Sequence, residues 1–124
     1  MSNINLAKSL LAWNKQYLKS NSHLKKENIA ECFADTFVVK ANGRQYEADH
    51  DNYLEFLNGF KSTIKSIDYE IDEYIIDGSS IVLPMLATIV RTDETVDKFE
   101  AMLWLKFNQQ GLITLWHEVY IGII

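Results

Sequence analysis

The sequence predicts one domain of the α+β class, because helical and strand-like patterns occupy different parts of the chain. Apolar residues at helical spacing run through most of the first half, and alternating apolar residues run through the second half. Turn residues divide the second half at short intervals, which favours antiparallel hairpins. The 124 residues suffice for one hydrophobic core. No internal repeat or linker divides them, so we expect a single domain over residues 1–124.

Two helices are expected before the first strand. Residues 4–20 carry an apolar stripe at helical spacing. Its members are Leu6, Leu10, Trp13 and Tyr17, with Leu11, Asn14 and Leu18 alongside. The second helix is expected at about residues 25–34, where three side chains share one side. These are Ile29, Cys32 and Phe33.

A hairpin and a third helix follow. Residues 36–41 have the composition of a strand, and Asn42-Gly43 is a strong two-residue turn signal because both turn positions need positive φ. The third helix is expected to start between Asp49 and Asp51, whose carboxylates suit the exposed N–H groups of a first turn. Its apolar stripe comprises Tyr53, Leu54, Phe56, Leu57, Phe60 and Ile64.

Four strands are expected in the rest of the chain, at residues 66–77, 79–91, 95–108 and 111–122. The last three are apolar on both faces, and three helices can cover only one face. We therefore expect the other face to pack against a second copy of the chain in a homodimer. The residues assigned to that outer face are Leu83, Met85, Ala87, Ile89, Met102, Trp104, Leu115, His117 and Val119.

The composition argues against several classes of function. Twelve basic and 17 acidic residues give a net charge of −5, so neither nucleic acid nor an anionic membrane is expected as a partner. No apolar run is long enough for a membrane span, and the first residues lack the pattern of a signal peptide, so we expect a cytoplasmic location. The single cysteine, Cys32, cannot form an internal disulfide.

No cofactor or metal is expected. The chain lacks a glycine-rich phosphate loop and a dinucleotide fingerprint. His50 stands in the acidic run 47–51, but no second histidine lies at ligand spacing. We interpret the run as the charged first turn of a helix.

Two segments resemble the nuclear transport factor 2-like superfamily, which includes ketosteroid isomerases, SnoaL-like polyketide cyclases and limonene epoxide hydrolases. They are IAECFADTFVV at residues 29–39 and LKFNQQGLITLWHEVY at residues 105–120, and the order of the elements agrees over nearly the whole chain. The resemblance implies a cystatin-like cone, in which a curved sheet of about six strands wraps round three N-terminal helices. It also implies an apolar pocket in the cone and dimers formed through the outer sheet face.

The resemblance further implies which side chains meet a small apolar ligand. Trp116, Glu118 and Tyr120 would point into the cone from the last strand, and His50 would lie at its rim. The other expected ligand contacts are Trp13, Phe56, Phe60 and Leu103.

Glu118 is the first candidate for a catalytic residue. It alternates with Trp116 and Tyr120 on one side of the last strand. A carboxylate among aromatic side chains loses hydration, which raises its pKa and suits it to act as a general base or acid. Proteins similar to the epoxide hydrolases and SnoaL-like cyclases often carry an acid here. The alternative is a structural glutamate held by a neighbouring hydrogen bond.

Tyr17 is the second candidate. Its spacing from Phe33 resembles that of the oxyanion tyrosine of ketosteroid isomerases, so it would donate a hydrogen bond to a substrate oxygen. The alternative, which the base rate favours, is a core tyrosine on a helix stripe.

Other catalytic residues of these relatives are replaced. The isomerase aspartate falls at Ala41 or Asn42, and its second acid falls near Leu103. The hydrolase arginine–aspartate pair falls near Met85 and Ala87, or at best is displaced to Arg91 and Asp93 in a turn. Two functions therefore remain open. One is an isomerase, dehydratase, cyclase or hydrolase that uses an acid/base carboxylate in an apolar pocket without a cofactor. The alternative is a non-catalytic dimeric module that binds a ligand or another protein.

Overall fold

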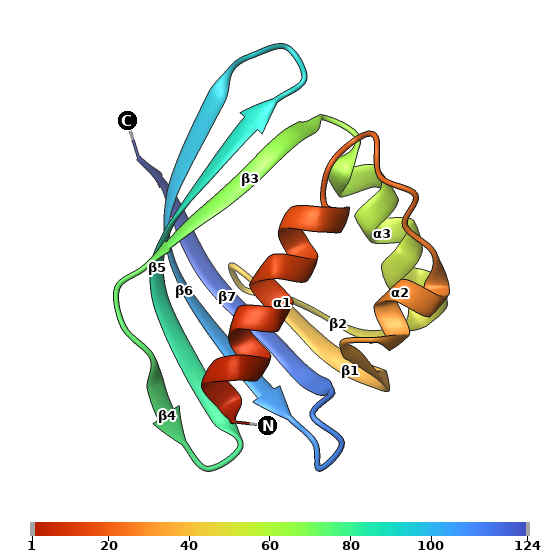
Figure 1. The fold of residues 1–124 in the computed structure, drawn as a ribbon, viewed down its shortest axis with the longest axis vertical. Coiled ribbons are helices and arrows are strands. Elements are labelled where there is room, and N and C mark those ends of the chain that lie inside the picture. The colour runs from red at the N-terminus through yellow and green to blue at the C-terminus, as the bar shows by residue number, and fades with distance from the viewer. Residues whose placement is uncertain (1, 124) are drawn as a thin grey trace.

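A curved sheet of seven strands packs against three helices that lie on one of its faces (Figure 1). The computed structural model describes residues 2–123. The helices are α1 (Asn3–Tyr17), α2 (Lys26–Ala30) and α3 (His50–Lys61). The strands are β1 (Phe33–Ala41), β2 (Arg44–Asp49), β3 (Ile64–Ile71), β4 (Ile75–Asp77), β5 (Ser80–Arg91), β6 (Val96–Phe107) and β7 (Ile113–Ile123). The expected α+β class is confirmed.

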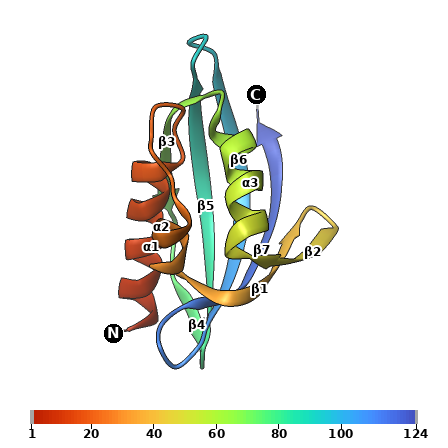
Figure 2. The same ribbon diagram turned by 90° about the vertical axis from the view of Figure 1, so that its right-hand side faces the viewer.

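The last strand lies in the middle of the sheet. The strand order is β2-β1-β7-β6-β5-β3, and the short β4 pairs with β5. β1 is parallel to β7, and all the other pairs are antiparallel. Figure 2 shows α1 and α3 in front of the same, concave face of this sheet. A helix that crosses a membrane needs about 20 apolar residues, and no helix within residues 2–123 meets this requirement.

The second helix is shorter than expected, and the first strand starts earlier. Phe33 begins β1 and does not lie in a helix that runs to residue 34, because it pairs with Ile113 of β7. Its buried ring lies 4.8 Å from the ring of Phe37 and 5.0 Å from that of Tyr53, measured between centroids. Pairing with a strand 80 residues later in the chain outweighs the local helical spacing.

The strand expected at residues 66–77 is divided into β3 and β4. Ile71 pairs with Met85 of β5, and Ile75 pairs with Val82, so one extra residue is accommodated between the two pairs. Pro84 lies opposite this interruption and has no N–H to donate to the ladder. Its carbonyl oxygen accepts a bond of 2.9 Å from the Asp72 amide.

The face assigned to β5 from the sequence is wrong. Met85 and Ala87 are 5% and 8% exposed and face the helices, as Leu83 and Ile89 also do. In antiparallel pairs, opposite residues share a face, and Met85 lies opposite Ala101. Because both faces of β5 are apolar, the alternation alone does not distinguish them, and only the register with β6 fixes which face is inside.

The start of α3 agrees with the sequence analysis. Asp49 Oδ1 accepts a bond of 2.8 Å from the Asn52 amide, and Asn52 Oδ1 accepts one of 3.0 Å from the Asp49 amide. This capping box pairs two backbone donors that the helix itself cannot satisfy. It fixes where α3 begins and therefore which of its side chains face the sheet.

The predicted Asn42-Gly43 turn joins β1 to β2, and Asn42 also forms hydrogen bonds with the backbone of β7. Both residues have positive φ, 49° and 88°. The Asn42 side chain accepts a bond of 2.7 Å from the Tyr120 amide and donates one of 2.9 Å to the Tyr120 carbonyl. The Asn42 amide donates to the Glu118 carbonyl at 3.1 Å. Three hydrogen bonds from one turn residue therefore hold the backbone of β7 in place between residues 118 and 120.

Replacing Asn42 by glycine keeps the positive φ but removes both side-chain hydrogen bonds to Tyr120. We expect Asn42→Gly to lower the free energy of unfolding by about 1–2 kcal/mol, as measured by urea denaturation. Asn42→Ala should lose about 1 kcal/mol more, because a β-carbon disfavours left-handed backbone. Equal stability of Asn42→Gly and the wild type would show that the two bonds contribute nothing.

Candidate functional site

A cavity of about 300 Å³ lies between the concave face of the sheet and the helices α1 and α3. Most of its wall is apolar and comes from β3, β5, β6 and the two helices, with Ile67, Met85 and Leu103 among the contributors. Six polar residues also reach it: Asn14, Tyr53, Tyr69, Arg91, Glu118 and Tyr120. An apolar wall with a few polar groups is typical of a site for a small molecule.

Three lining residues come from one face of β7. Trp116, Glu118 and Tyr120 alternate with side chains that point to the opposite face, as the sequence pattern predicts. Glu118 lies opposite Leu103 of β6 on one side and opposite Ala41 of β1 on the other. A side chain on a strand with neighbours on both sides cannot turn away to the sheet edge, so its carboxylate stays on the cavity wall.

Burial dominates the electrostatics of Glu118. Loss of hydration raises the pKa of its carboxyl above the ordinary glutamate value, and interaction with the Trp116 side chain lowers it by a smaller amount. Within residues 2–123, no ion pair includes Glu118. It is also the single carboxylate among the lining residues. The proton affinity of this group is therefore set by an apolar environment and not by a fixed cation.

Two of the three phenols that line the cavity, Tyr53 and Tyr69, accompany this carboxylate together with the amide of Asn14. Asn14 Nδ2 donates a bond of 3.1 Å to the Tyr69 hydroxyl. Burial raises the pKa of Tyr69 and that of Tyr53 well above the ordinary tyrosine value. The hydrogen bond from Asn14 lowers the pKa of Tyr69 by a smaller amount, and the negative charge of Glu118 raises both values further. Both phenols therefore stay protonated at neutral pH and can act as hydrogen-bond donors.

Arg91 is the single cationic residue among those that line the cavity. Its Nε lies 2.8 Å from Asp97 Oδ2, and its Nη1 donates to Thr63 Oγ1 at 3.1 Å. Asp97 balances the charge of Arg91. Arg91 therefore lines the cavity as half of an ion pair and not as a free cation.

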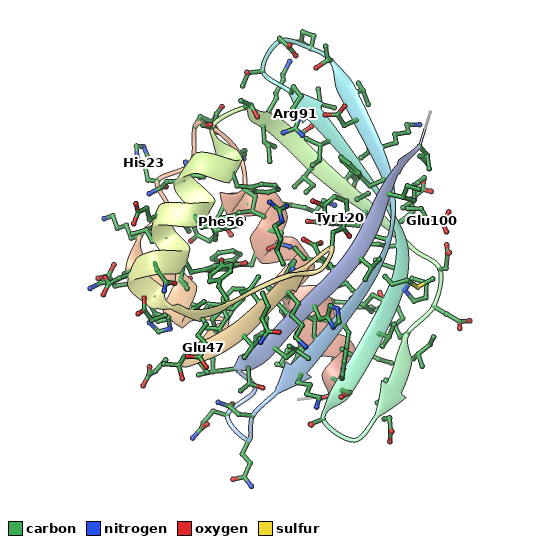
Figure 3. All side chains as sticks on the ribbon, turned by 180° about the vertical axis from the view of Figure 1, so that it is seen from behind. His23, Glu47, Phe56, Arg91, Glu100 and Tyr120 are labelled. Carbon is green, nitrogen blue, oxygen red and sulfur yellow. The ribbon has the colours of Figure 1, made fainter. Side chains whose placement is uncertain are left out.

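The cavity opens beside α3. Phe56 and Phe60 line it and are also 50% and 39% exposed, so their rings form its rim. The two rings stack with their centroids 6.1 Å apart and an interplanar angle of 13°. Figure 3 shows Phe56 on α3 and Tyr120 on β7 facing the same gap. A ligand that enters there would first meet aromatic faces.

Three residues expected at the ligand lie elsewhere. Trp13 and Tyr17 are on the side of α1 that faces α2, where Trp13 Nε1 donates to the Asn28 carbonyl at 3.0 Å and the Tyr17 hydroxyl accepts from Asn28 Nδ2 at 3.0 Å. Both line a separate surface groove and not the cavity. His50 Nε2 contacts the carbonyl oxygens of Phe33 and Ala34 at 3.1 and 2.9 Å. Its ring therefore links the start of α3 to the backbone of β1.

Four polar lining residues were not proposed as site residues from the sequence. Asn14 gave the clearest signal, because it is a polar residue within the apolar stripe of the first helix. Tyr53 and Tyr69 look like ordinary core aromatics in a helix stripe and an alternating strand. Arg91 was considered from the sequence only as a displaced hydrolase arginine in a turn; it is the last residue of β5 and lines the cavity.

The described part of the chain offers no obvious metal centre. No group of three or more His, Cys, Asp or Glu side chains converges within residues 2–123. Cys32 lines the separate surface groove, and burial together with the nearby Glu31 raises the pKa of its thiol to about 11. Such a thiol is protonated and a poor nucleophile at neutral pH.

Together, these groups can do a limited set of chemistry. Glu118 can take up or release one proton, the phenols can donate to an oxygen, and the apolar wall can hold the carbon skeleton of a small molecule. The arrangement has no second carboxylate to act as a partner acid.

No protein-family model and no curated protein matches the chain. Similar solved structures include an LEH-like epoxide hydrolase from M. tuberculosis, 13% identical with a TM-score of 0.71, over 95% of this chain and 81% of that one. Another is a nuclear transport factor 2-like protein of unknown function from Burkholderia pseudomallei, 15% identical with a TM-score of 0.71, over 95% and 90%. A third, from Exiguobacterium sp. 255-15, has the same description, with 13% identity and a TM-score of 0.63 over 89% and 96%.

At these identities the likeness is one of fold. The order of helices and strands and the curved mixed sheet agree with the expectation drawn from residues 29–39 and 105–120. The chain therefore has the cone fold of the nuclear transport factor 2-like superfamily.

Proposed function

We propose that the protein binds a small, mostly apolar molecule that carries an oxygen function, and that Glu118 transfers a proton to or from this molecule. One observation carries the proposal: a carboxylate with a raised pKa lies on the wall of an apolar cavity, and no cation among the described residues 2–123 pairs with it. A carboxyl with a raised pKa is a stronger base when ionised and remains available as an acid closer to neutral pH. These are the properties that proton transfer requires.

The reaction classes within reach are isomerisation, dehydration, cyclisation and hydrolysis, each of which can begin with one proton transfer. One structurally similar protein is an LEH-like epoxide hydrolase. In this chain Met85 and Ala87 line the cavity, where the resemblance to epoxide hydrolases would place an arginine–aspartate pair. Arg91, the displaced alternative, also lines the cavity, but it pairs with Asp97 and not with Asp93, which bonds to Thr95. Epoxide hydrolysis through such a pair is therefore not part of the proposal.

A second candidate is a module that binds the same kind of ligand without reacting with it. Glu118 is the single carboxylate among the lining residues, and Tyr17, expected to complete the site, lies on the far side of α1. Both observations favour binding alone. The two candidates differ in one measurable property, which is whether a bound molecule exchanges a proton with Glu118.

A suitable probe is 2-tetralone, a bicyclic ketone whose C1 protons lie between a carbonyl and an aromatic ring and are readily removed by a base. We expect it to bind in the cavity, and its C1 hydrogens to exchange with deuterium from D2O faster than in buffer alone, as followed by NMR. Only the ionised carboxylate accepts a proton, so the rate should increase with pH through the raised pKa of Glu118 and then level off. Glu118→Gln should reduce the protein-dependent rate roughly 100-fold or more.

The matched control is Glu100→Gln, which changes a glutamate on the neighbouring strand. Figure 3 shows Glu100 on the outer side of the sheet, away from Tyr120. This variant should exchange like the wild type, and Ala101→Phe, which fills the cavity, should block binding and exchange. Binding without exchange in the wild type would favour the second candidate. Equal exchange in wild type and Glu118→Gln would rule out Glu118 as the base.

We further propose that the outer face of the sheet packs against a second copy of the chain. Met102 lies opposite Val119 in the sheet, and Val119 and Ile121 are 56% and 65% exposed. Met85 and Ala87 do not contribute, since they face the cavity. Adjacent exposed apolar side chains on two strands are typical of an interface between subunits.

We expect the wild type to sediment as a dimer in analytical ultracentrifugation at micromolar concentration. Val119→Glu should shift it to a monomer, because a homodimer places the substituted residue in the interface in both subunits. Glu55→Lys, an exposed change on α3, should leave the dimer intact. A wild type that sediments as a monomer would contradict the proposal.

A further inference from the structure

A buried polar pair joins α1 to β3 on the wall of the cavity. Asn14 is 2% exposed and lies between Leu10 and Leu18 on the apolar side of α1. Its Nδ2 donates to the Tyr69 hydroxyl at 3.1 Å. Burying an amide is unfavourable unless it finds a hydrogen-bond partner, and a leucine would suit this position better if packing were its only role.

The direction of this bond determines what Tyr69 can offer to a ligand. A tyrosine hydroxyl can accept hydrogen bonds but has only one proton to donate. Here the hydroxyl oxygen of Tyr69 accepts a hydrogen bond from Asn14, so the hydroxyl proton of Tyr69 takes no part in this contact. Within residues 2–123, no hydrogen bond places that proton on a protein acceptor. Since both residues line the cavity, the proton is available to whatever occupies it.

The charged groups around this pair keep the phenol in its donor form. Burial raises the pKa of Tyr69, and the hydrogen bond from Asn14 lowers it by a smaller amount. Glu118 on β7 and Asp68, its neighbour on β3, both raise it further. Tyr53 on α3 has its own pKa raised and is likewise protonated. The positive charge of Arg91 is balanced by the carboxylate of Asp97.

We propose that Tyr69 donates a hydrogen bond to an oxygen of the ligand and that Asn14 is the residue that orients the phenol for this. The inference rests on the proposed function and narrows the ligand class. The ligand carries an acceptor oxygen, of which a carbonyl is the simplest example, close to the carbon from which Glu118 takes a proton. Tyr69 thus fills the role that the sequence suggested for Tyr17.

The proposed step is balanced by groups in the cavity. The Glu118 carboxylate takes a proton from the carbon next to the carbonyl, and the C–H bonding pair forms a carbon–carbon double bond. The carbonyl π pair moves to the oxygen, which gains negative charge and accepts a stronger hydrogen bond from Tyr69. Return of the proton from Glu118 to carbon regenerates the carboxylate.

The test uses the infrared carbonyl band of bound 2-tetralone, because a hydrogen bond to a carbonyl oxygen lowers its stretching frequency. We expect a lower frequency in the wild type than in Tyr69→Phe. Tyr69→Phe should also weaken binding of 2-tetralone about three- to tenfold, and leave binding of the hydrocarbon tetralin unchanged. Glu118→Gln should keep the lowered frequency, since it leaves the donor in place.

Asn14→Asp tests the orienting role with almost no change in shape. When protonated, the introduced carboxyl can donate to Tyr69 as the amide does; when ionised, it can only accept, and so it takes the Tyr69 proton away from the ligand. We expect the carbonyl frequency in Asn14→Asp to rise with pH toward that of Tyr69→Phe. In the double variant Asn14→Asp/Tyr69→Phe it should not change with pH, and the wild type measured over the same range reports any contribution from Glu118.

The outcomes separate the two proposals. If 2-tetralone does not bind in the cavity, the proposed function is wrong and this inference is wrong with it. If the ketone binds with the same carbonyl frequency in wild type and Tyr69→Phe, the donor role alone is overturned. A frequency in Asn14→Asp that does not depend on pH overturns the orienting role of Asn14 and leaves that of Tyr69.

Discussion

The candidate site depends on one constraint, which is that β7 is hydrogen-bonded to a strand on each side. β6 pairs with it antiparallel, and β1 pairs with it parallel, so the strand that ends the chain lies in the middle of the sheet. Glu118 is consequently held between Leu103 and Ala41 and must face either the helices or the outside. The register places it on the helix side, where burial raises its pKa.

The same fold leaves space in front of this carboxylate. Phe33, Phe37 and Tyr53 pack against one another with ring centroids about 5 Å apart and fill one part of the concave face. Beside these rings the wall includes the small side chains of Ala87 and Ala101, and a cavity of about 300 Å³ remains. An unfilled cavity and a buried carboxylate that has no ion pair within residues 2–123 both destabilise a fold, so their presence together favours a role in binding or chemistry.

Much of this arrangement could be predicted from the sequence. The alternation in the last strand, the Asn-Gly turn and the helix start at Asp49 are local patterns, and the structure agrees with each of them. The inner face of β5 could not be predicted, because both of its faces are apolar and only pairing with β6 separates them. Asn14 and Tyr69 are 55 residues apart in the chain, so their contact depends on tertiary structure that no local pattern encodes. The spacing along the first helix is compatible with either Tyr17 or Asn14 facing the cavity. In the structure Tyr17 faces α2, where its hydroxyl accepts a hydrogen bond from Asn28, and Asn14 lines the cavity.

Burial in the cavity removes water from around the Glu118 carboxyl, and the rest of the site depends on this. The most direct measurement is a ¹³C NMR titration of that carboxyl in the folded protein. We predict a midpoint for Glu118 above the ordinary value of about 4.3 for glutamate. A midpoint at or below that value would contradict this, because the carboxylate would then be hydrated or paired and the cavity would not raise its proton affinity.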